Sequence, residues 1–117
     1  MVRITHELLK KKSEHHEGLL NELEEIALHQ LEIEKLENFN VCRKLKILLL
    51  QGNRISKIEN LRKLKELRYL NLAINQVMKI ENLEGLESLE KLDLSVNYIR
   101  NLLDIELLKA NEFLVEL

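Results

Sequence analysis

The stretches LQGNRISKIENLRKLKEL (residues 50–67) and LAINQVMKIENLEGLESL (residues 72–89) follow one pattern with a 22-residue period, and KIEN stands at the same place in both, at 57–60 and at 79–82. When the pattern is shifted by one period in either direction, it also fits the flanking sequence, which gives four tandem copies. A period of this length is typical of proteins in which each copy is one structural unit that stacks on its neighbours.

Seven apolar slots and one asparagine slot define the pattern. In the second copy these slots are filled by Leu45, Leu48, Leu50, Asn53, Ile55, Ile58, Leu61 and Leu64. The seven apolar slots hold apolar residues in every copy, which chance would give about 0.4% of the time per copy at this composition. The frame predicts repeats at residues 23–44, 45–66, 67–88 and 89–113, with an incomplete fifth repeat at 114–117.

The slots spell LxxLxLxxNxI followed by apolar residues at every third position, which is the leucine-rich-repeat pattern. The alternation at Leu48 and Leu50 predicts a short strand whose side chains at these two positions point into the core. The three-residue spacing of Ile58, Leu61 and Leu64 favours 3-10 or short helical turns. We therefore expect an α/β leucine-rich-repeat solenoid with parallel strands on the concave face and short helical or 3-10 turns on the convex face.

The asparagine slot follows each predicted strand, where the chain turns. A buried amide can donate to and accept from backbone groups that a turn leaves unpaired. We therefore expect Asn53, Asn75 and Asn97 to form a structural ladder along the stacked repeats. The first repeat has Leu31 in this slot, and we expect an apolar residue to be tolerated there beside the N-terminal cap.

Residues 1–22 lie outside the repeat pattern and are predicted to be a helical cap over the first repeat. Thr5 is a good N-cap, and Glu7 is favoured in the first helical turn by the helix dipole. We expect a helix from Thr5 to Lys12 and a second from Ser13. The apolar residues expected to face the repeats are Leu8, Leu9, Leu19 and Leu20.

A coiled coil over residues 19–37 is the rival interpretation of the first copy. A heptad frame on Leu20 and Leu23 continues to Ala27, Gln30 and Glu34, so the apolar pattern fails by the second heptad. The repeat interpretation is therefore preferred.

Leu114 and Leu117 resemble the first two leucines of a fifth repeat, in the places that Leu89 and Leu92 hold in the fourth. A solenoid end without a covering element exposes core residues and an unpaired strand edge. We expect the chain to be part of a longer protein or to be covered at this end, and we expect self-association through it.

The concave side of the predicted strands is the candidate binding surface. Ile47, Leu49 and Tyr69 give it an apolar centre with polar neighbours, a composition that often marks a site for a protein partner. The alternative is apolar surface that is simply tolerated. The seven residues that we call the strand face are Ile47, Leu49, Gln51, Tyr69, Asn71, Lys91 and Asp93.

The sequence holds no catalytic set and predicts no enzyme, no cofactor and no metal. A phosphate-binding loop motif and a G-x-S-x-G motif are both absent. The run EHHE (residues 14–17) places adjacent histidines about 100° apart on a helix, which suits a solvated face better than a metal site. Cys42, the single cysteine, occupies an apolar core slot and is expected to be a buried, unreactive thiol.

The charge and hydropathy of the sequence argue against nucleic acids and membranes as partners, which leaves proteins. The net charge is −2 with both signs mixed along the chain, which argues against a nucleic-acid-binding surface. No apolar run approaches the roughly 20 residues that cross a bilayer, and the start of the chain does not have the pattern of a secretory signal. With a single cysteine, these features favour the reducing cytoplasm.

Several segments resemble a known family. The KIENL repeats resemble the 22-residue class of the phosphatase regulator suppressor of dis two. The segments ITHELLKKKSEHH (4–16), LEEIALHQLEIEKLE (23–37) and KLDLSVNYI (91–99) are more similar to the tilB/seahorse family of leucine-rich-repeat dynein axonemal assembly factors. That family continues with a final repeat, a cap and a chaperone-like β-sandwich domain, so the chain is expected to correspond to its N-terminal part.

The resemblance implies a non-enzymatic scaffold in the cytoplasmic preassembly of axonemal dynein arms for motile cilia. It implies chaperones, co-chaperones and other dynein assembly factors as partners, and the cytoplasm, with the cilium second, as the location. The alternative function is that of a phosphatase-regulating or generic adaptor repeat protein.

Overall fold

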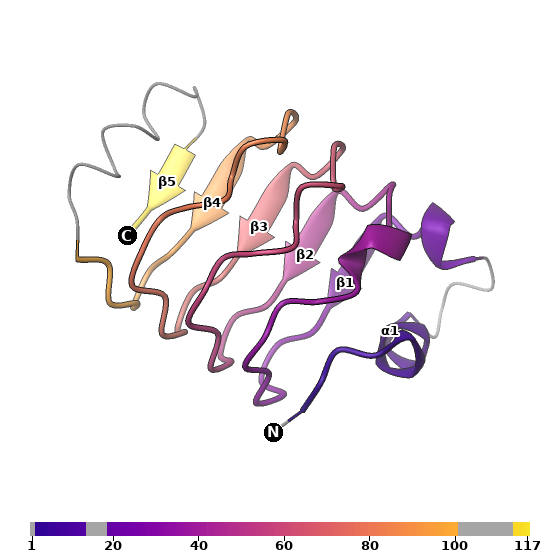
Figure 1. The fold of residues 1–117 in the computed structure, drawn as a ribbon, viewed down its shortest axis with the longest axis horizontal. Helices are drawn as coiled ribbons and strands as arrows, with labels where there is room; N and C mark the ends of the chain where they lie inside the picture. Colours follow the sequence, from indigo (N-terminus) through magenta and orange to yellow (C-terminus); the bar gives the residue numbers. More distant parts are fainter. Residues whose placement is uncertain (1, 14–18, 101–113) are drawn as a thin grey trace.

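The computed structural model describes residues 2–13, 19–100 and 114–117, which form a solenoid around one parallel sheet. The strands follow one another in chain order across the sheet (Figure 1). Their bounds are β1 Glu25–Ala27, β2 Ile47–Leu49, β3 Tyr69–Asn71, β4 Lys91–Asp93 and β5 Leu114–Glu116. The predicted leucine-rich-repeat solenoid with parallel strands is confirmed.

The repeat period determines the strand register. Ile26, Leu48, Leu70 and Leu92 stand opposite one another in β1 to β4, and all four side chains are buried. The residues on either side of them point away from the core, as strand alternation requires. Each repeat thus contributes one layer to a single continuous apolar core, which no repeat could close alone.

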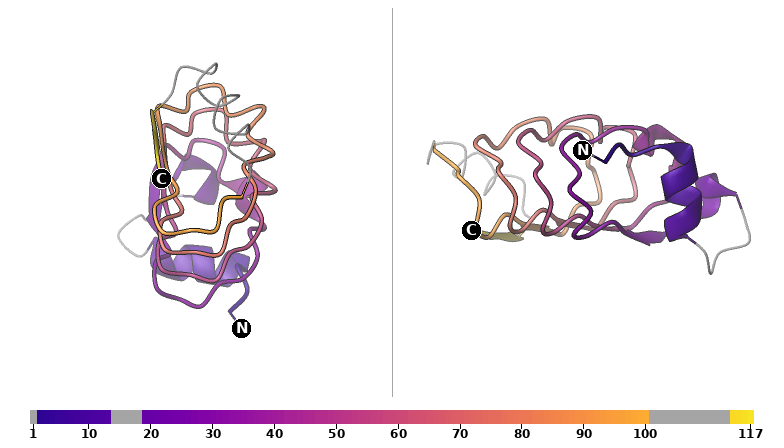
Figure 2. Two further views of the ribbon diagram at one scale, coloured as in Figure 1. Left: turned by 90° about the vertical axis from the view of Figure 1, so that its left-hand side faces the viewer. Right: turned by 90° about the horizontal axis from the view of Figure 1, so that it is seen from below.

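The chain returns on the opposite side of the core through short turns (Figure 2). Only Phe39–Val41 is long enough to count as a 3-10 helix (η2) on this side of the described chain. The next two repeats use single turns with the same i to i+3 hydrogen bonds, such as Leu64 N–H to the Leu61 carbonyl at 3.0 Å and Leu86 N–H to the Leu83 carbonyl at 3.2 Å. These turns explain the apolar residues at every third position.

Helix α1 (His6–Lys12) lies at the β1 end of the sheet (Figure 1). Thr5 is its N-cap, since its hydroxyl accepts from the Leu8 N–H at 3.1 Å. Leu9 is buried, and Ile4 joins it in the core. The predicted capping helix is therefore confirmed in place and in length.

Leu19 corrects part of the cap prediction. Its side chain is 69% exposed, whereas Leu8 and Leu20 pack against the core. Leu19 has an extended backbone directly before the 3-10 turn η1 (Leu20–Glu22). The backbone changes from extended at Leu19 to 3-10 at Leu20, so the two side chains point to different sides and Leu19 faces away when Leu20 faces the core. The second helix expected from Ser13 falls largely on residues 14–18, outside the described residues.

The register of β5 also differs from the prediction. Leu92 stands opposite Val115, so Leu117 does not take the slot of Leu92. Leu114 stands opposite Lys91, at an outward position, and is 59% exposed. The half-buried Val115 packs against the core in its place. Strand pairing decides between two registers that this short apolar run allows equally well.

Candidate functional site

The sheet register assembles the predicted strand face. Ile47, Tyr69 and Lys91 stand side by side in one row across β2, β3 and β4. The neighbouring row consists of Leu49, Asn71 and Asp93, and Gln51 follows β2. All seven side chains are half-buried, so they form one continuous outward surface over the middle of the sheet.

The apolar centre of the strand face is bounded by an ordered cation. The Lys91 ammonium lies 5.3 Å from the centroid of the Tyr69 ring and 3.0 Å from the Glu116 carboxylate. A hydrogen bond with Glu116, followed by its charge, raises the pKa of Lys91. A cation held over a tyrosine face is attracted by the ring quadrupole. The Lys91 ammonium therefore favours one orientation of the Tyr69 ring.

Two polar residues of the strand face make hydrogen bonds to nearby backbone groups. Asn71 Oδ1 accepts from the Ala73 N–H at 3.0 Å, and Asp93 Oδ1 accepts from the Ser95 N–H at 2.9 Å. Gln51 differs, because its Oε1 is buried and meets no hydrogen-bond donor within the described part of the chain. Buried acceptors without a donor are unfavourable, which distinguishes Gln51 from Asn71 and Asp93.

The predicted asparagine positions form an inner ladder, which we define as Asn53, Asn75 and Asn97. The Asn75 Nδ2 donates to the Leu50 carbonyl of the preceding repeat at 3.0 Å and to the Leu72 carbonyl of its own repeat at 3.1 Å. Its Oδ1 accepts from the Ile55 N–H at 3.0 Å. The other two asparagines repeat these contacts in the neighbouring repeats on either side. Each amide thus ties one turn to the turn before it.

The first repeat needs no asparagine of its own. The Leu31 N–H donates to Asn53 Oδ1 at 3.0 Å, and the Leu31 side chain packs against the core. The neighbouring repeat therefore supplies the amide for this turn.

A second, outer ladder was not predicted from the sequence. It consists of Asn38, Asn60 and Asn82, the last residues of KLEN (35–38), KIEN (57–60) and KIEN (79–82). Their backbones are left-handed, with φ of 66°, 61° and 59°. Each Nδ2 donates to a carbonyl of the preceding layer, that of Ile4, Leu36 or Ile58, at 2.6 to 2.7 Å. Asparagine tolerates this conformation better than most residues, and its recurrence at the repeat period was the available signal.

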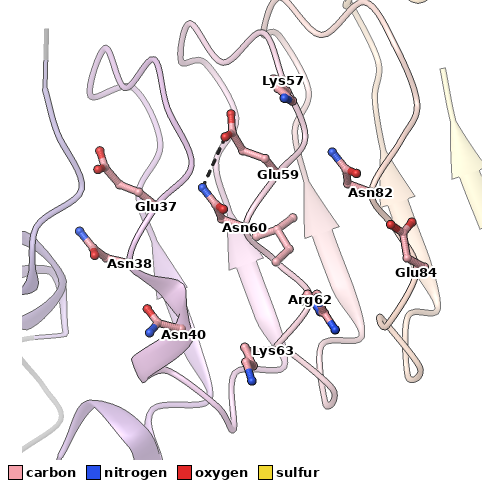
Figure 3. A pocket seen from close by; sticks show the side chains of 11 residues that line it. Glu37, Asn38, Asn40, Lys57, Glu59, Asn60, Arg62, Lys63, Asn82 and Glu84 are labelled. Atoms are coloured by element: carbon pink, nitrogen blue, oxygen red, sulfur yellow. Dashed lines mark hydrogen bonds between the residues drawn. The ribbon is translucent and has the colours of Figure 1, made fainter.

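The outer ladder borders an open cavity of about 670 Å³ on the return side (Figure 3). Its lining alternates in charge, with Lys57, Arg62 and Lys63 beside Glu37, Glu59 and Glu84. The ladder amides facing it already bond to backbone carbonyls. Three cations and three anions balance in this lining, and the arrangement suits a solvated structural surface.

The turns that follow the strands form a different surface. The residue directly before the inner asparagine slot has a left-handed backbone in all four repeats. Its φ is 53° at Gln30, 71° at Gly52, 56° at Ile74 and 57° at Val96. Glycine adopts this conformation freely, whereas residues with a Cβ lose roughly 1–2 kcal/mol in it. Ile74 and Val96 are also 58% and 71% exposed. Two strained, branched apolar residues therefore stand in solvent in successive repeats.

The described residues outside these surfaces do not gather into a reactive site. Cys42 is buried, and burial raises the pKa of its thiol. Within the described ranges, no three His, Cys, Asp or Glu side chains gather as a metal site would require. Residues 14–17 fall outside these ranges. None of the described helices has the length and hydropathy of a membrane span.

The sequence comparisons agree with this geometry. A profile described as Leucine Rich repeats (2 copies) matches residues 43–85. Protein tilB of Drosophila melanogaster is 63% identical over 54 residues, which are 45% of this chain and 14% of that protein. Dynein axonemal assembly factor 11 is 51% identical over 54 residues in Trypanosoma brucei brucei and 55% identical over 51 residues in Homo sapiens. These matches cover 14% and 11% of the two relatives, so the chain spans a small part of their length.

Solved structures share the fold. A leucine-rich-repeat protein of Leptospira interrogans superposes with a TM-score of 0.73 at 24% identity, covering 81% of this chain and 25% of that one. A chain of the Drosophila melanogaster SNF/U2A' complex superposes with a TM-score of 0.63 at 20% identity, covering 99% of this chain and 84% of that one. At these identities the likeness concerns the fold.

Proposed function

We propose that this leucine-rich-repeat chain, which is similar to tilB and dynein axonemal assembly factor 11, is a non-enzymatic scaffold that assists the preassembly of axonemal dynein arms in the cytoplasm. The observation that carries the proposal is the identity of 51% to 63% over 51 or 54 residues to proteins of these names. An identity of this size exceeds what the shared repeat slots alone require, because the slots fix only a minority of the positions in each repeat.

We propose that the partner is a protein and that it docks on the strand face. Ile47, Leu49 and Tyr69 form a contiguous half-buried apolar surface with Lys91 and Asp93 at its border. Tyrosine is frequent at interface hot spots, and its orientation by Lys91 lowers the entropy lost on binding. By resemblance, chaperones, co-chaperones and other dynein assembly factors are the candidates.

The Gln51 amide adds a polar anchor to this surface. Its buried Oε1 meets no donor in the described part of the chain, and a rotation of the side chain would present it to a partner N–H. A bound segment that donates one hydrogen bond to Gln51 Oε1, beside the apolar centre, would satisfy this acceptor.

An affinity capture from the cytosol of ciliated cells tests the proposal. The bait is this chain, compared with an Ile47→Glu/Tyr69→Ala variant. An Arg62→Ala/Lys63→Glu variant is the control, since it makes similar changes at exposed positions on the return side. All three must melt at the same temperature.

We expect dynein chains or dynein assembly factors to be captured by the first and third baits and lost from the second. Equal capture by all three would remove the strand face from the proposal. Capture of a phosphatase catalytic subunit, without dynein-related proteins, would overturn the assembly role in favour of the adaptor alternative.

A further inference from the structure

The turns after the second, third and fourth strands share an unusual composition. We call this surface the turn edge and define it as QGNRISKI (51–58), AINQVMKI (73–80) and SVNYIR (95–100). These segments hold four cationic residues and no acidic one, although the whole chain has a net charge of −2. The corresponding segment of the first repeat, HQLEIEKL (29–36), holds two glutamates. The charge of the turn edge is thus particular to repeats two to four.

Backbone hydrogen bonds hold the three turns side by side. The Gly52 N–H donates to the Ala73 carbonyl at 3.0 Å, and the Ile74 N–H donates to the Ser95 carbonyl at 2.8 Å. The Arg100 N–H donates to the Met78 carbonyl at 3.2 Å. Residues in equivalent slots of neighbouring repeats are therefore adjacent in space, which places Ile74 beside Val96.

Four large apolar side chains stand exposed on this edge. Ile74 is 58% exposed, Met78 42%, Val96 71% and Tyr98 62%. They are four of the eight large apolar side chains that are exposed among the described residues. Single exposed apolar residues need no explanation, but several gathered on neighbouring turns indicate a place where a partner binds.

Backbone strain argues that these residues do not serve the fold itself. Ile74 and Val96 occupy the slot that holds Gly52 in the second repeat, with φ of 56° and 57°. A β-branched side chain is the least suitable choice for this conformation. Burial does not compensate for this strain, because both side chains are exposed. Backbone strain of this kind concentrates at functional sites, where a residue is selected for its function and not for its backbone preference.

The surrounding charges indicate the chemistry of the partner. Arg54, Lys79 and Arg100 flank the apolar group on the same segments, and Lys57 lies on one of them at the border of the return-side cavity. The Arg54 and Lys79 side chains are 55% and 67% exposed and have only loose contacts to Glu32 at 3.7 Å and to Glu81 at 3.4 Å. Exposed contacts of this length are weak and can yield to a partner's carboxylates.

We propose that the turn edge is a second interaction surface, separate from the strand face, and that it binds an acidic peptide segment carrying large apolar side chains. The apolar residues anchor the segment and the cations select its charge. Four cations interspersed with three aliphatic side chains and a single tyrosine suit a peptide better than nucleic acid, which requires a denser basic surface or several stacking aromatics.

Selection from a library of random peptides displayed on phage tests this inference. The immobilised target is the full chain, and the comparison target is an Ile74→Asn/Val96→Asn variant. Asparagine accepts the left-handed backbone, so this variant should melt several degrees higher while losing the apolar anchors. An Ile47→Glu/Tyr69→Ala variant keeps the turn edge and removes the strand face.

We expect the chain and the strand-face variant to enrich peptides that combine Asp or Glu with Leu, Phe or Trp. Synthetic copies of these peptides should bind the Ile74→Asn/Val96→Asn variant at least about tenfold more weakly, in spite of its higher stability. A purely structural role cannot separate affinity from stability in this way. Should the double variant melt lower, Tyr98→Ser, which lies outside the strained positions, provides the same comparison.

Three results would overturn the inference. The first is no enrichment of acidic apolar peptides. The second is enrichment that the turn-edge variants leave unchanged. The third is binding of phosphatidylserine-containing vesicles or single-stranded DNA in place of peptides. Loss of peptide binding only in the strand-face variant would assign the peptides to the proposed scaffold surface and not to the turn edge.

Discussion

The molecule contains two asparagine ladders that look alike in sequence and differ in what they do. The inner ladder (Asn53, Asn75 and Asn97) lies beside the strand ends, and its amides bond to their own turn and to the turn before it. The outer ladder (Asn38, Asn60 and Asn82) lies on the return side, and its amides bond to a carbonyl of the preceding layer.

Burial and backbone conformation separate the two ladders. Asn53 and Asn75 are buried, so their amides take the place of water at the backbone groups of the turns. Asn60 is exposed and has a left-handed backbone, with φ of 61°. The same residue type at the same period thus serves hydrogen bonding alone at the inner ladder, and both hydrogen bonding and a left-handed backbone at the outer ladder. This difference can be tested by substitution.

The largest effect is expected at Asn75. Asn75→Ala should lower the free energy of unfolding by roughly 1–3 kcal/mol, because it leaves the buried Ile55 N–H without its partner and removes the amide's hydrogen bonds to the Leu50 and Leu72 carbonyls. Chemical denaturation measures this change. Gln76→Ala is the control, since this neighbour is exposed and should alter stability by less than about 0.5 kcal/mol. Equal melting of the two variants would contradict the inner ladder.

An intermediate effect is expected at Asn60, where alanine and glycine should differ. Asn60→Gly should cost about 0.5–1.5 kcal/mol for the lost bond to Leu36. Asn60→Ala should cost about 1 kcal/mol more, because alanine also resists the left-handed backbone. The glycine variant should thus be more stable than the alanine variant, which is the reverse of the usual order for these two residues. The same denaturation experiment decides it, and equal costs would show that conformation does not matter at this site.

The smallest effect is expected beside Asn38, where the outer ladder meets the cap. Arg3 contacts the Glu37 carboxylate through two hydrogen bonds of 2.8 and 2.7 Å. These bonds, together with the charge of Arg3, hold the pKa of Glu37 below its usual value. A lowered carboxyl pKa stabilises the fold above the ordinary carboxyl range, and this stability is lost as the pH falls through the lowered value.

Glu37→Gln should therefore reduce stability slightly at neutral pH and make its decline on acidification shallower. Thermal melts from neutral to strongly acidic pH measure both effects. Glu34→Gln, at an exposed position nearby, controls for the removal of one charge. A Glu37→Gln profile parallel to that of the unmodified chain would show that the ion pair contributes nothing to cap attachment.

Much of the architecture follows from the repeat frame. The frame predicted the strands through the alternation at Leu48 and Leu50 and the three-residue turns through Ile58, Leu61 and Leu64, and the N-cap at Thr5 predicted the helix. The prediction missed Leu19, whose direction depends on a single extended residue, and the β5 register, where Val115 stands opposite Leu92. Both misses lie outside the regular copies, where a period can give no guidance.

The sequence by itself determined which residues are equivalent, because the repeat period assigns each slot a layer of the core and each apolar slot must be buried. Only the tertiary structure decided what each equivalent slot does. The left-handed backbones of Asn60 and Ile74 and the carbonyls within reach of each amide arise from stacking. The gathering of Ile74 and Val96 on one edge also arises only when neighbouring repeats are in contact. Such contacts join residues far apart in the chain, and no local pattern specifies them.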